Sequence, residues 1–168
     1  MSAMRELAVD LWASDPPVDA RCITTNNALR RNGTAICGAG CAKEAVARYP
    51  EIEAVLGLLI RENGPVLHVV DDGGLDDRTL AWDPPLIAFP VKHHWRARAD
   101  LDLIVQSATT LATLIDDRGW TDVWLPRPGC GLGGLDWDRD VRPALEPILD
   151  DRVVIIDFPA QRAAPGRP

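Results

Sequence analysis

The longest regular pattern of hydrophobic residues lies between Asp100 and Arg118 and predicts an amphipathic helix. Its apolar positions recur at spacings of three and four residues, which places them on one face: Leu101, Ile104, Val105, Ala108, Leu111, Ala112 and Ile115. Asp100 can cap the first turn, and Gly119 suits the position that follows the last turn. We therefore expect a helix that buries one face against a sheet.

Shorter apolar runs bounded by Gly, Pro and Asn predict strands that alternate with further helices. The expected strands are 7–12, 20–25, 66–70, 80–90 with an interruption at Pro84 and Pro85, 122–126 and 153–158. The other expected helices are 42–49, 52–62 and 141–149, and a turn is expected at 71–74. This alternation predicts an α/β fold, a three-layer α/β/α sandwich with a mixed central sheet. We expect one domain over 1–158 and a flexible tail over 159–168.

Composition places the chain among ordinary globular proteins. Its 168 residues suffice for one domain, 46% of them are hydrophobic, and no apolar run has the length of a membrane helix. The N-terminus has an acidic residue, Glu6, within six residues and lacks the apolar core of a signal peptide, so we expect a cytoplasmic protein. We also expect a monomer. The four cysteines, Cys22, Cys37, Cys41 and Cys130, do not complete a zinc set with any nearby histidine, so we expect reduced core thiols and no metal.

The net charge of −7 argues against a protein that coats nucleic acid, although it leaves room for a local cationic cleft. Of the 18 basic residues only two are lysines, Lys43 and Lys92. Six tryptophans accompany one tyrosine and two phenylalanines. For Trp12, Trp95 and Trp137 we expect core packing, with stacking against a nucleotide base as the alternative.

Two glycine-rich loops carry the clearest chemical signal. The first, 32–40, runs into a helix, and the second, 126–135, leaves a strand and precedes a helix. Glycines allow a chain to present backbone N–H groups without interference from Cβ, and a helix N-terminus adds partial positive charge. Neither loop has the Gly-Lys-Ser/Thr ending of a P-loop or the spacing of a dinucleotide fingerprint. The pair predicts a ligand that carries a diphosphate.

Three stretches give the chain a specific resemblance: 22–26 together with 38–42, then 89–96, then 125–137. Through them the chain resembles the macrodomain family of ADP-ribose-binding modules, in the branch of the terminal ADP-ribose protein glycohydrolases and the DNA ADP-ribosyl glycohydrolases. The similarity covers most of 7–158, and the family fold is the sandwich expected above. The resemblance implies no metal or redox cofactor.

The resemblance also assigns ligand contacts. Asp10 matches the family aspartate that accepts from the adenine amine, although Val9 stands where the family has glycine. Asn26 matches the residue that contacts the distal ribose, whose diol suits an amide. The diphosphate loops correspond to the residues Gly38, Ala39, Gly40, Gly129, Cys130, Gly131, Leu132, Gly133 and Gly134. Arg30 and Arg31 either contact phosphate or lie in solvent.

The resemblance places Lys92 at the position of the branch's catalytic lysine, which acts as an amine nucleophile at the anomeric carbon or as a stabilising cation. The protein glycohydrolases have an acid/base aspartate where this chain has Gly133. Asp136 follows three residues later and is the candidate replacement, with helix capping as the alternative.

The resemblance implies a hydrolase that removes mono-ADP-ribose from a modified macromolecule. We expect an ester on an acidic protein side chain as substrate, with ADP-ribosylated thymidine in DNA as the nearest rival. The remaining alternatives are a phosphatase acting on ADP-ribose 1″-phosphate and a reader that binds ADP-ribose without turnover. The expected partners are ADP-ribose and ADP-ribosylated protein or DNA.

Overall fold

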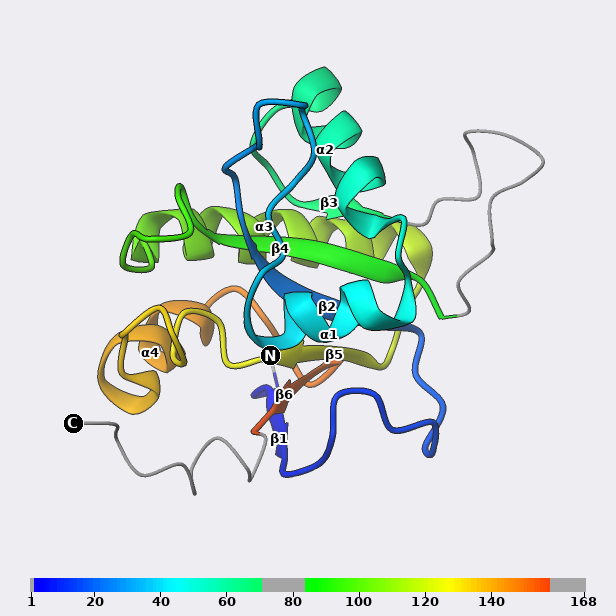
Figure 1. Cartoon of the computed structure of the whole chain (residues 1–168). Helices are drawn as coiled ribbons and strands as arrows, with labels where there is room; N and C mark the ends of the chain where they lie inside the picture. Colours follow the sequence, from blue (N-terminus) through cyan, green and yellow to red (C-terminus); the bar gives the residue numbers. More distant parts are fainter. Residues whose placement is uncertain (1, 71–83, 158–168) are drawn as a thin grey trace.

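A six-stranded sheet forms the centre of the molecule, in a computed structural model that describes residues 2–70 and 84–157. The strands are β1 (Arg5–Leu7), β2 (Ala20–Asn26), β3 (His68–Val69), β4 (Leu86–Lys92), β5 (Val123–Pro126) and β6 (Val153–Ile156), in the order β1-β6-β5-β2-β4-β3. All neighbours are parallel except β3 and β4, which are antiparallel. The sheet is therefore mixed, as predicted (Figure 1).

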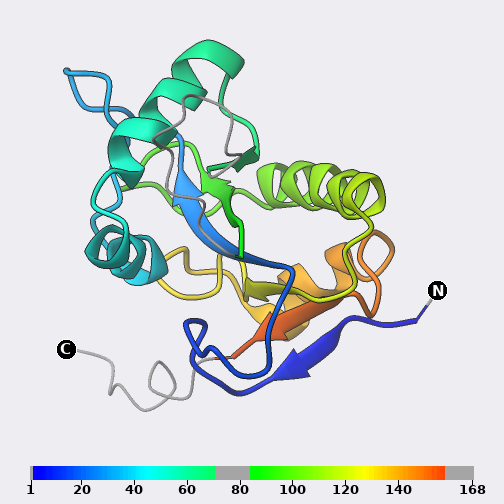
Figure 2. The same cartoon turned by 90° about the vertical axis from the view of Figure 1, so that its right-hand side faces the viewer.

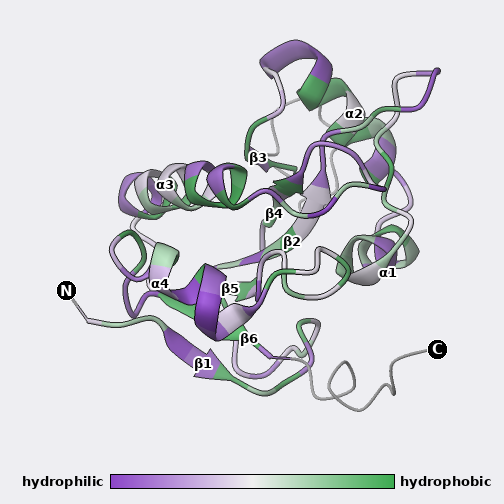
Figure 3. Cartoon of the chain, turned by 90° about the vertical axis from the view of Figure 1, so that its left-hand side faces the viewer, coloured by the Kyte–Doolittle hydropathy of each residue, from purple (hydrophilic) through white to green (hydrophobic). Residues whose placement is uncertain are grey.

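Helices cover both faces of this sheet. They are α1 (Gly40–Arg48), α2 (Ile52–Asn63), α3 (Leu101–Arg118) and α4 (Arg142–Leu145), and the π-helix η1 (Trp137–Val141) precedes α4. The sheet lies between α1 and α2 on one side and α3 and α4 on the other (Figures 2 and 3). The three-layer prediction is confirmed.

The hydrophobic pattern of the strands explains the two covered faces. Along β6, Val153 and Ile155 pack with the core beneath α3 and α4, whereas Val154 and Ile156 pack with the core beneath α1 and α2. Successive side chains of a strand point to opposite faces, so a strand covered on both faces reads as a continuous apolar run. The pattern over 153–156 is therefore dictated by burial on both sides.

The helix predicted from Asp100 to Arg118 is confirmed as α3, together with both of its ends. The side chain of Asp100 accepts from the Asp102 N–H at 2.9 Å, and Gly119 adopts a left-handed conformation with φ of 66°. Ile104, among the residues of the predicted stripe, is fully buried against the sheet. The stripe thus fixes how α3 lies on the sheet.

Several predicted boundaries were wrong. The strand expected at 7–12 lies at Arg5–Leu7, because the Asp10 side chain accepts from the Trp12 N–H and the Asp10 carbonyl from the Ala13 N–H, which reverses the chain. The strand expected at 66–70 shortens to two residues. The helix expected at 141–149 starts earlier, at Trp137, and its regular part ends at Leu145, shortly before Pro147, which has no N–H to donate.

The fourth strand also differs from its prediction, and this difference matters for the site. It begins after Pro85 and continues through Pro90 to Lys92, two residues beyond the predicted end. The expected turn at 71–74, residues 80–83 of the expected strand, and the tail at 159–168 lie outside the described residues. Within the described ranges, no helix combines the length and apolar character that crossing a bilayer requires.

Candidate functional site

A cleft of about 970 Å³ opens at the carboxyl ends of the parallel strands. Ligands of open α/β sheets bind at this edge, and the volume is in the range of small-molecule and cofactor sites. The cleft is lined by all the predicted site residues except Gly134: Asp10, Asn26, Gly38, Ala39, Gly40, Lys92, Gly129, Cys130, Gly131, Leu132, Gly133 and Asp136. The fold therefore brings both glycine loops, the lysine and the candidate carboxylate into one space.

Strand register places Asn26 beside Lys92. The two residues are partners at the ends of the adjacent strands β2 and β4, directly after an irregularity between Thr25 and Asn26. Pro90 occupies the neighbouring position of β4 opposite Thr25, where it cannot donate a ladder hydrogen bond. Such irregularities redirect side chains at the ends of strands. They put Asn26 and Lys92 on adjacent strands at the carboxyl end of the sheet.

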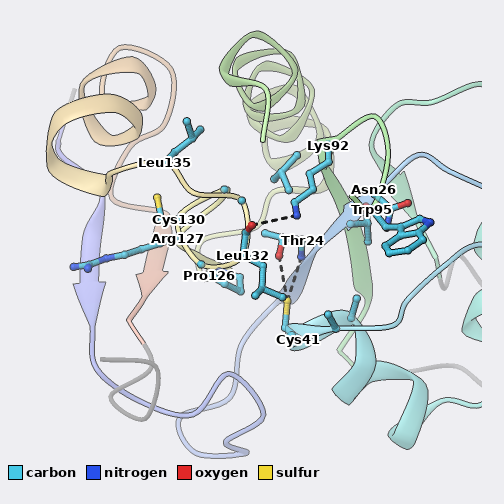
Figure 4. A pocket seen from close by; sticks show the side chains of 18 of the residues that line it. Thr24, Asn26, Cys41, Lys92, Trp95, Pro126, Arg127, Cys130, Leu132 and Leu135 are labelled. Atoms are coloured by element: carbon cyan, nitrogen blue, oxygen red, sulfur yellow. Dashed lines mark hydrogen bonds between the residues drawn. The ribbon is translucent and has the colours of Figure 1, made fainter. Parts of the chain in front are cut away.

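The Lys92 ammonium reaches across to the second glycine loop. Its Nζ donates to the Leu132 carbonyl at 3.4 Å, as the dashed line in Figure 4 shows. The same loop is held from this side by two further bonds: the Ala99 N–H donates to the Gly133 carbonyl at 3.0 Å, and Arg98 donates to the Gly134 carbonyl at 3.1 Å. Lys92 is thus part of the framework that orients this loop.

With its carbonyls bound on that side, the second loop leaves its N–H groups available. The N–H groups of Gly131, Leu132 and Gly133 donate to no acceptor among the described residues. In the first loop the same holds for Gly38 and Ala39, and Ala39 provides no side-chain cap for α1. The cleft is therefore lined by two sets of open backbone donors, and one set lies at a helix N-terminus, where partial positive charge favours an anion.

The first loop is held in place by α2. Glu53 on α2 accepts from the Cys37 N–H at 2.9 Å and pairs with Arg30, which also donates to the Ala35 carbonyl. Of the two arginines that were considered for phosphate contact, Arg30 therefore serves the loop itself. Burial tends to raise the pKa of Glu53, but hydrogen bonds from Arg30 and the Cys37 N–H outweigh it and hold that pKa below its ordinary value.

Asn26 and Asp10 each use part of their hydrogen-bonding capacity inside the protein. Asn26 donates to the Ile36 carbonyl at 2.9 Å and accepts from the Ala28 N–H at 3.0 Å. Asp10 accepts from the Trp12 N–H through one oxygen. An amide keeps a second N–H and a second lone pair, and a carboxylate a second oxygen, so both side chains can still contact a ligand.

Asp136 caps η1. Its Oδ1 accepts from the Arg139 N–H at 2.7 Å, which is the alternative that the sequence left open. The carboxylate is exposed and lines the cleft, so a catalytic role for it remains a prediction. Gly133 leaves no room for the missing aspartate: a Cβ there would lie 2.6 Å from the Gly129 carbonyl oxygen and 2.7 Å from Ala99 Cβ. The acid/base group of the protein glycohydrolases does not fit this loop.

The thiols are unsuited to act as nucleophiles. Cys22 and Cys37 are buried, as expected. Burial raises the pKa of Cys37 and of Cys130 to about 12, and it also raises that of Cys41, whose sulfur contacts Thr24. A thiol that stays protonated at neutral pH is a poor nucleophile. Among the candidates in the cleft, Lys92 therefore has the most suitable chemistry.

The tryptophans fulfil the packing prediction in two of three cases. Trp137 is buried, and Trp12 is half-buried, where its Nε1 donates to Glu44 at 2.6 Å. Trp95 contradicts the prediction, because it is 45% exposed and lines the cleft. No hydrophobic periodicity identifies such a residue, since it lies in the irregular segment after β4.

Comparison with solved structures identifies the fold. The chain is 28% identical to the macrodomain of Mycobacterium tuberculosis DarG, with a TM-score of 0.70 over 93% of this chain and 98% of that one. The macrodomain of Thermus aquaticus DarG gives a TM-score of 0.67 at 23% identity over 95% of this chain and all of that one. Thermosipho africanus DarTG, solved in complex with ADP-ribose, gives 0.67 at 21% identity over 88% of this chain and 40% of that one. No protein-family model matches the chain.

The fold is that of a macrodomain. At the sequence level, 110 residues are 32% identical to the DNA ADP-ribosyl glycohydrolases of Mycobacterium bovis and Mycobacterium tuberculosis, over 64% of this chain. The aligned part covers 30% of those longer relatives. These similarities support a macrodomain of the DarG-like branch, which the loop motifs predicted.

Proposed function

We propose that this macrodomain binds ADP-ribose and hydrolyses the bond that joins it to a base in DNA. The observation that carries the proposal is the pairing of Asn26 with Lys92 beside two loops of open backbone donors. The similarity to relatives named DNA ADP-ribosyl glycohydrolase supports DNA as the substrate. It favours this substrate over the protein ester that the sequence ranked first.

In this proposal the diphosphate lies between the two loops. Their free N–H groups donate to its oxygens, and the N-terminus of α1 contributes partial positive charge. Asp10 accepts from the adenine amine, and Asn26 contacts the distal ribose. This orientation brings the anomeric carbon of that ribose to Lys92.

The reaction is a hydrolysis in which the bond from the anomeric carbon to the base nitrogen breaks. Water supplies a hydroxyl group to the carbon and a proton to the leaving base. Lys92 contacts the reacting centre, and Asp136, directly after the second loop, is the candidate for moving the proton. One well-placed group of this kind contributes about 10²–10⁴-fold to the rate.

The chain's two lysines provide a matched test. ADP-ribose release is measured from a single-stranded oligonucleotide carrying ADP-ribosyl-thymidine and from a peptide carrying an ADP-ribosyl-glutamate ester. We expect Lys92→Ala to lower release from the oligonucleotide by about 100-fold or more. Lys43→Ala, on the exposed surface of α1, should retain the wild-type rate.

Each other outcome contradicts a stated part of the proposal. Equal rates for Lys92→Ala and the wild type exclude the assigned role of Lys92. Release from the peptide alone replaces DNA by a protein ester as the substrate. Calorimetric binding of ADP-ribose without release from either substrate identifies a reader, and the absence of binding rejects the whole assignment.

A further inference from the structure

The segment directly after Lys92 forms a cationic and aromatic edge of the cleft. This rim segment, 93–98, contains two histidines, a tryptophan and two arginines, and it has no carboxylate. Trp95 and Arg96 line the cleft, and both are exposed. His93 pairs with the Asp100 carboxylate at 2.8 Å, whereas Arg96, which lines the cleft, pairs with no carboxylate among the described residues.

The rim segment has a defined structure of its own. The Ala97 N–H donates to the His94 carbonyl at 3.0 Å, and the Arg96 N–H donates to His94 Nδ1 at 3.1 Å. The rings of His94 and Trp95 stack with centroids 5.3 Å apart, and the Arg96 guanidinium lies 4.5 Å from the Trp95 centroid. Its cations and its aromatic ring are therefore held together at the cleft.

Charge differs between the parts of the cleft. Glu44 lies on α1, and Asp10 lines the cleft two residues before Trp12, which donates to Glu44. Lys92 lines it at the end of β4 and Arg96 lines it in the rim segment, whereas Asp136 and Asp138 line it after the second glycine loop. In the proposed orientation the adenine lies at Asp10 and the modified base extends past Lys92. A polyanion attached to the base therefore leaves the cleft over its basic edge.

We propose that the rim segment binds the single strand of DNA that flanks the modified base. Trp95 stacks against a neighbouring base. As the strand binds, the Arg96 guanidinium leaves the Trp95 ring and contacts a phosphate oxygen. Arg98, bonded to the Gly134 carbonyl, keeps guanidinium donors for a second phosphate. Basic side chains interleaved with aromatic rings are the usual surface for unpaired nucleic acid, and a modified base is unpaired when it enters a cleft. This inference rests on the proposed function.

The test compares a long and a short substrate. One is a single-stranded oligonucleotide carrying ADP-ribosyl-thymidine, and the other is ADP-ribosyl-thymidine as a nucleoside. Trp95→Ala should lower kcat/KM for the oligonucleotide about tenfold, because it removes a base stack. Arg96→Gln should lower it by about the same factor, because it removes a phosphate contact. Both variants should leave kcat/KM for the nucleoside and the Kd of free ADP-ribose unchanged. Arg96→Gln should also make the decline of oligonucleotide binding with salt less steep.

A second arginine–tryptophan pair provides the control. The Arg118 guanidinium lies 5.7 Å from the Trp120 centroid at the far end of α3, so Arg118→Gln removes the same charge away from the cleft. We expect this variant to treat both substrates as the wild type does. Equal losses on both substrates, or no loss on the oligonucleotide, would overturn the rim proposal.

Binding separates the rim proposal from the proposed function. The Kd values of the modified oligonucleotide and of free ADP-ribose are measured for the wild type and both rim variants. If the wild type binds the oligonucleotide more tightly than free ADP-ribose and the rim variants do not, the rim proposal is supported. This holds even if the wild type releases no ADP-ribose. If the wild type releases ADP-ribose and the rim variants have the same kcat/KM and Kd values as the wild type, the proposed function is supported and the rim proposal is rejected.

Discussion

The two glycine loops look alike in sequence, but glycine is present in them for different structural reasons. In the first loop a Cβ at Gly38 would meet nothing within 4 Å, so the protein itself does not require glycine there. In the second loop a Cβ at Gly133 would lie 2.6 Å from the Gly129 carbonyl oxygen, and one at Gly129 would lie 2.7 Å from Ile104 Cδ1. At these positions the second loop is packed against α3 and residues 92–99, whereas Gly38 of the first loop is open to the cleft. The start of the first loop, at Gly33, packs against Arg61 of α2.

Glycines a few residues apart in one cluster can therefore have different roles. Some allow close internal packing, and others leave space for a ligand. Gly131 lies inside the packed loop, yet a Cβ there meets nothing within 4 Å. Gly133 and Gly131 therefore form a matched pair, one required by the fold and the other open to the cleft. Substituting each of these two glycines separately tests the packing role and the ligand-access role.

The largest effect is expected from Gly133→Ala. The added methyl group must displace backbone at Gly129 and the side chain of Ala99, and overpacking of this kind costs about 1–3 kcal/mol. Chemical denaturation should show that decrease in the free energy of unfolding, together with loss of ADP-ribose binding. A variant as stable as the wild type would show that the loop moves freely and that its packing is not a constraint.

An intermediate effect is expected from Gly131→Ala. Its methyl group projects into open space in the cleft, so the free energy of unfolding should change by less than about 0.5 kcal/mol. Calorimetry should nevertheless show the Kd of ADP-ribose rising about tenfold, because the methyl group keeps the phosphate from the open N–H groups and each such bond contributes about 1.5–3 kcal/mol. Unchanged affinity would place the diphosphate elsewhere.

The smallest effect is expected from Glu53→Gln, which weakens the support of the first loop. The pair with Arg30 is partly exposed, so we expect a loss of less than about 1 kcal/mol. Because the pKa of Glu53 lies below its ordinary 4.5, the carboxylate stabilises the folded state above pH 4.5, and this contribution disappears as the pH falls through the lowered value.

Denaturation curves between pH 3 and pH 7 test this sign. The difference in stability between wild type and Glu53→Gln should be largest at neutral pH and should shrink in acid. Glu62→Gln, an exposed position on the same helix, provides the control and should show a smaller difference at neutral pH. A difference that grows as the pH falls would contradict the assignment.

Much of the fold could be predicted from the sequence, because burial of one or both faces of an element gives its hydrophobic residues a regular spacing. The stripe of α3 and the apolar run of β6 both reflect contact with a covered sheet. The first strand could not be placed by that signal, because all of β1 is exposed at the sheet edge and the hydrogen bonds of Asp10 end the extended run. The end of β4 depends on its pairing with Asn26, a contact 66 positions away in the chain.

Some parts of the candidate site could be predicted from the sequence, and others could not. The loops and Lys92 could be found because glycine spacing and a rare lysine are visible in the sequence. The exposure of Trp95, the packing at Gly133 and the bonds of 92–99 to the second loop depend on which segments the fold brings together. None of these leaves a local pattern.

The central claim is that both loops bind the same diphosphate, and an amide-resolved NMR titration with ADP-ribose tests it most directly. We expect the N–H signals of Gly38–Gly40 and Gly131–Gly133 to shift together and to fit one Kd. Signals of α3 residues near Arg118 should stay in place. Shifts confined to one loop, or two loops that fit different affinities, would contradict a shared diphosphate site.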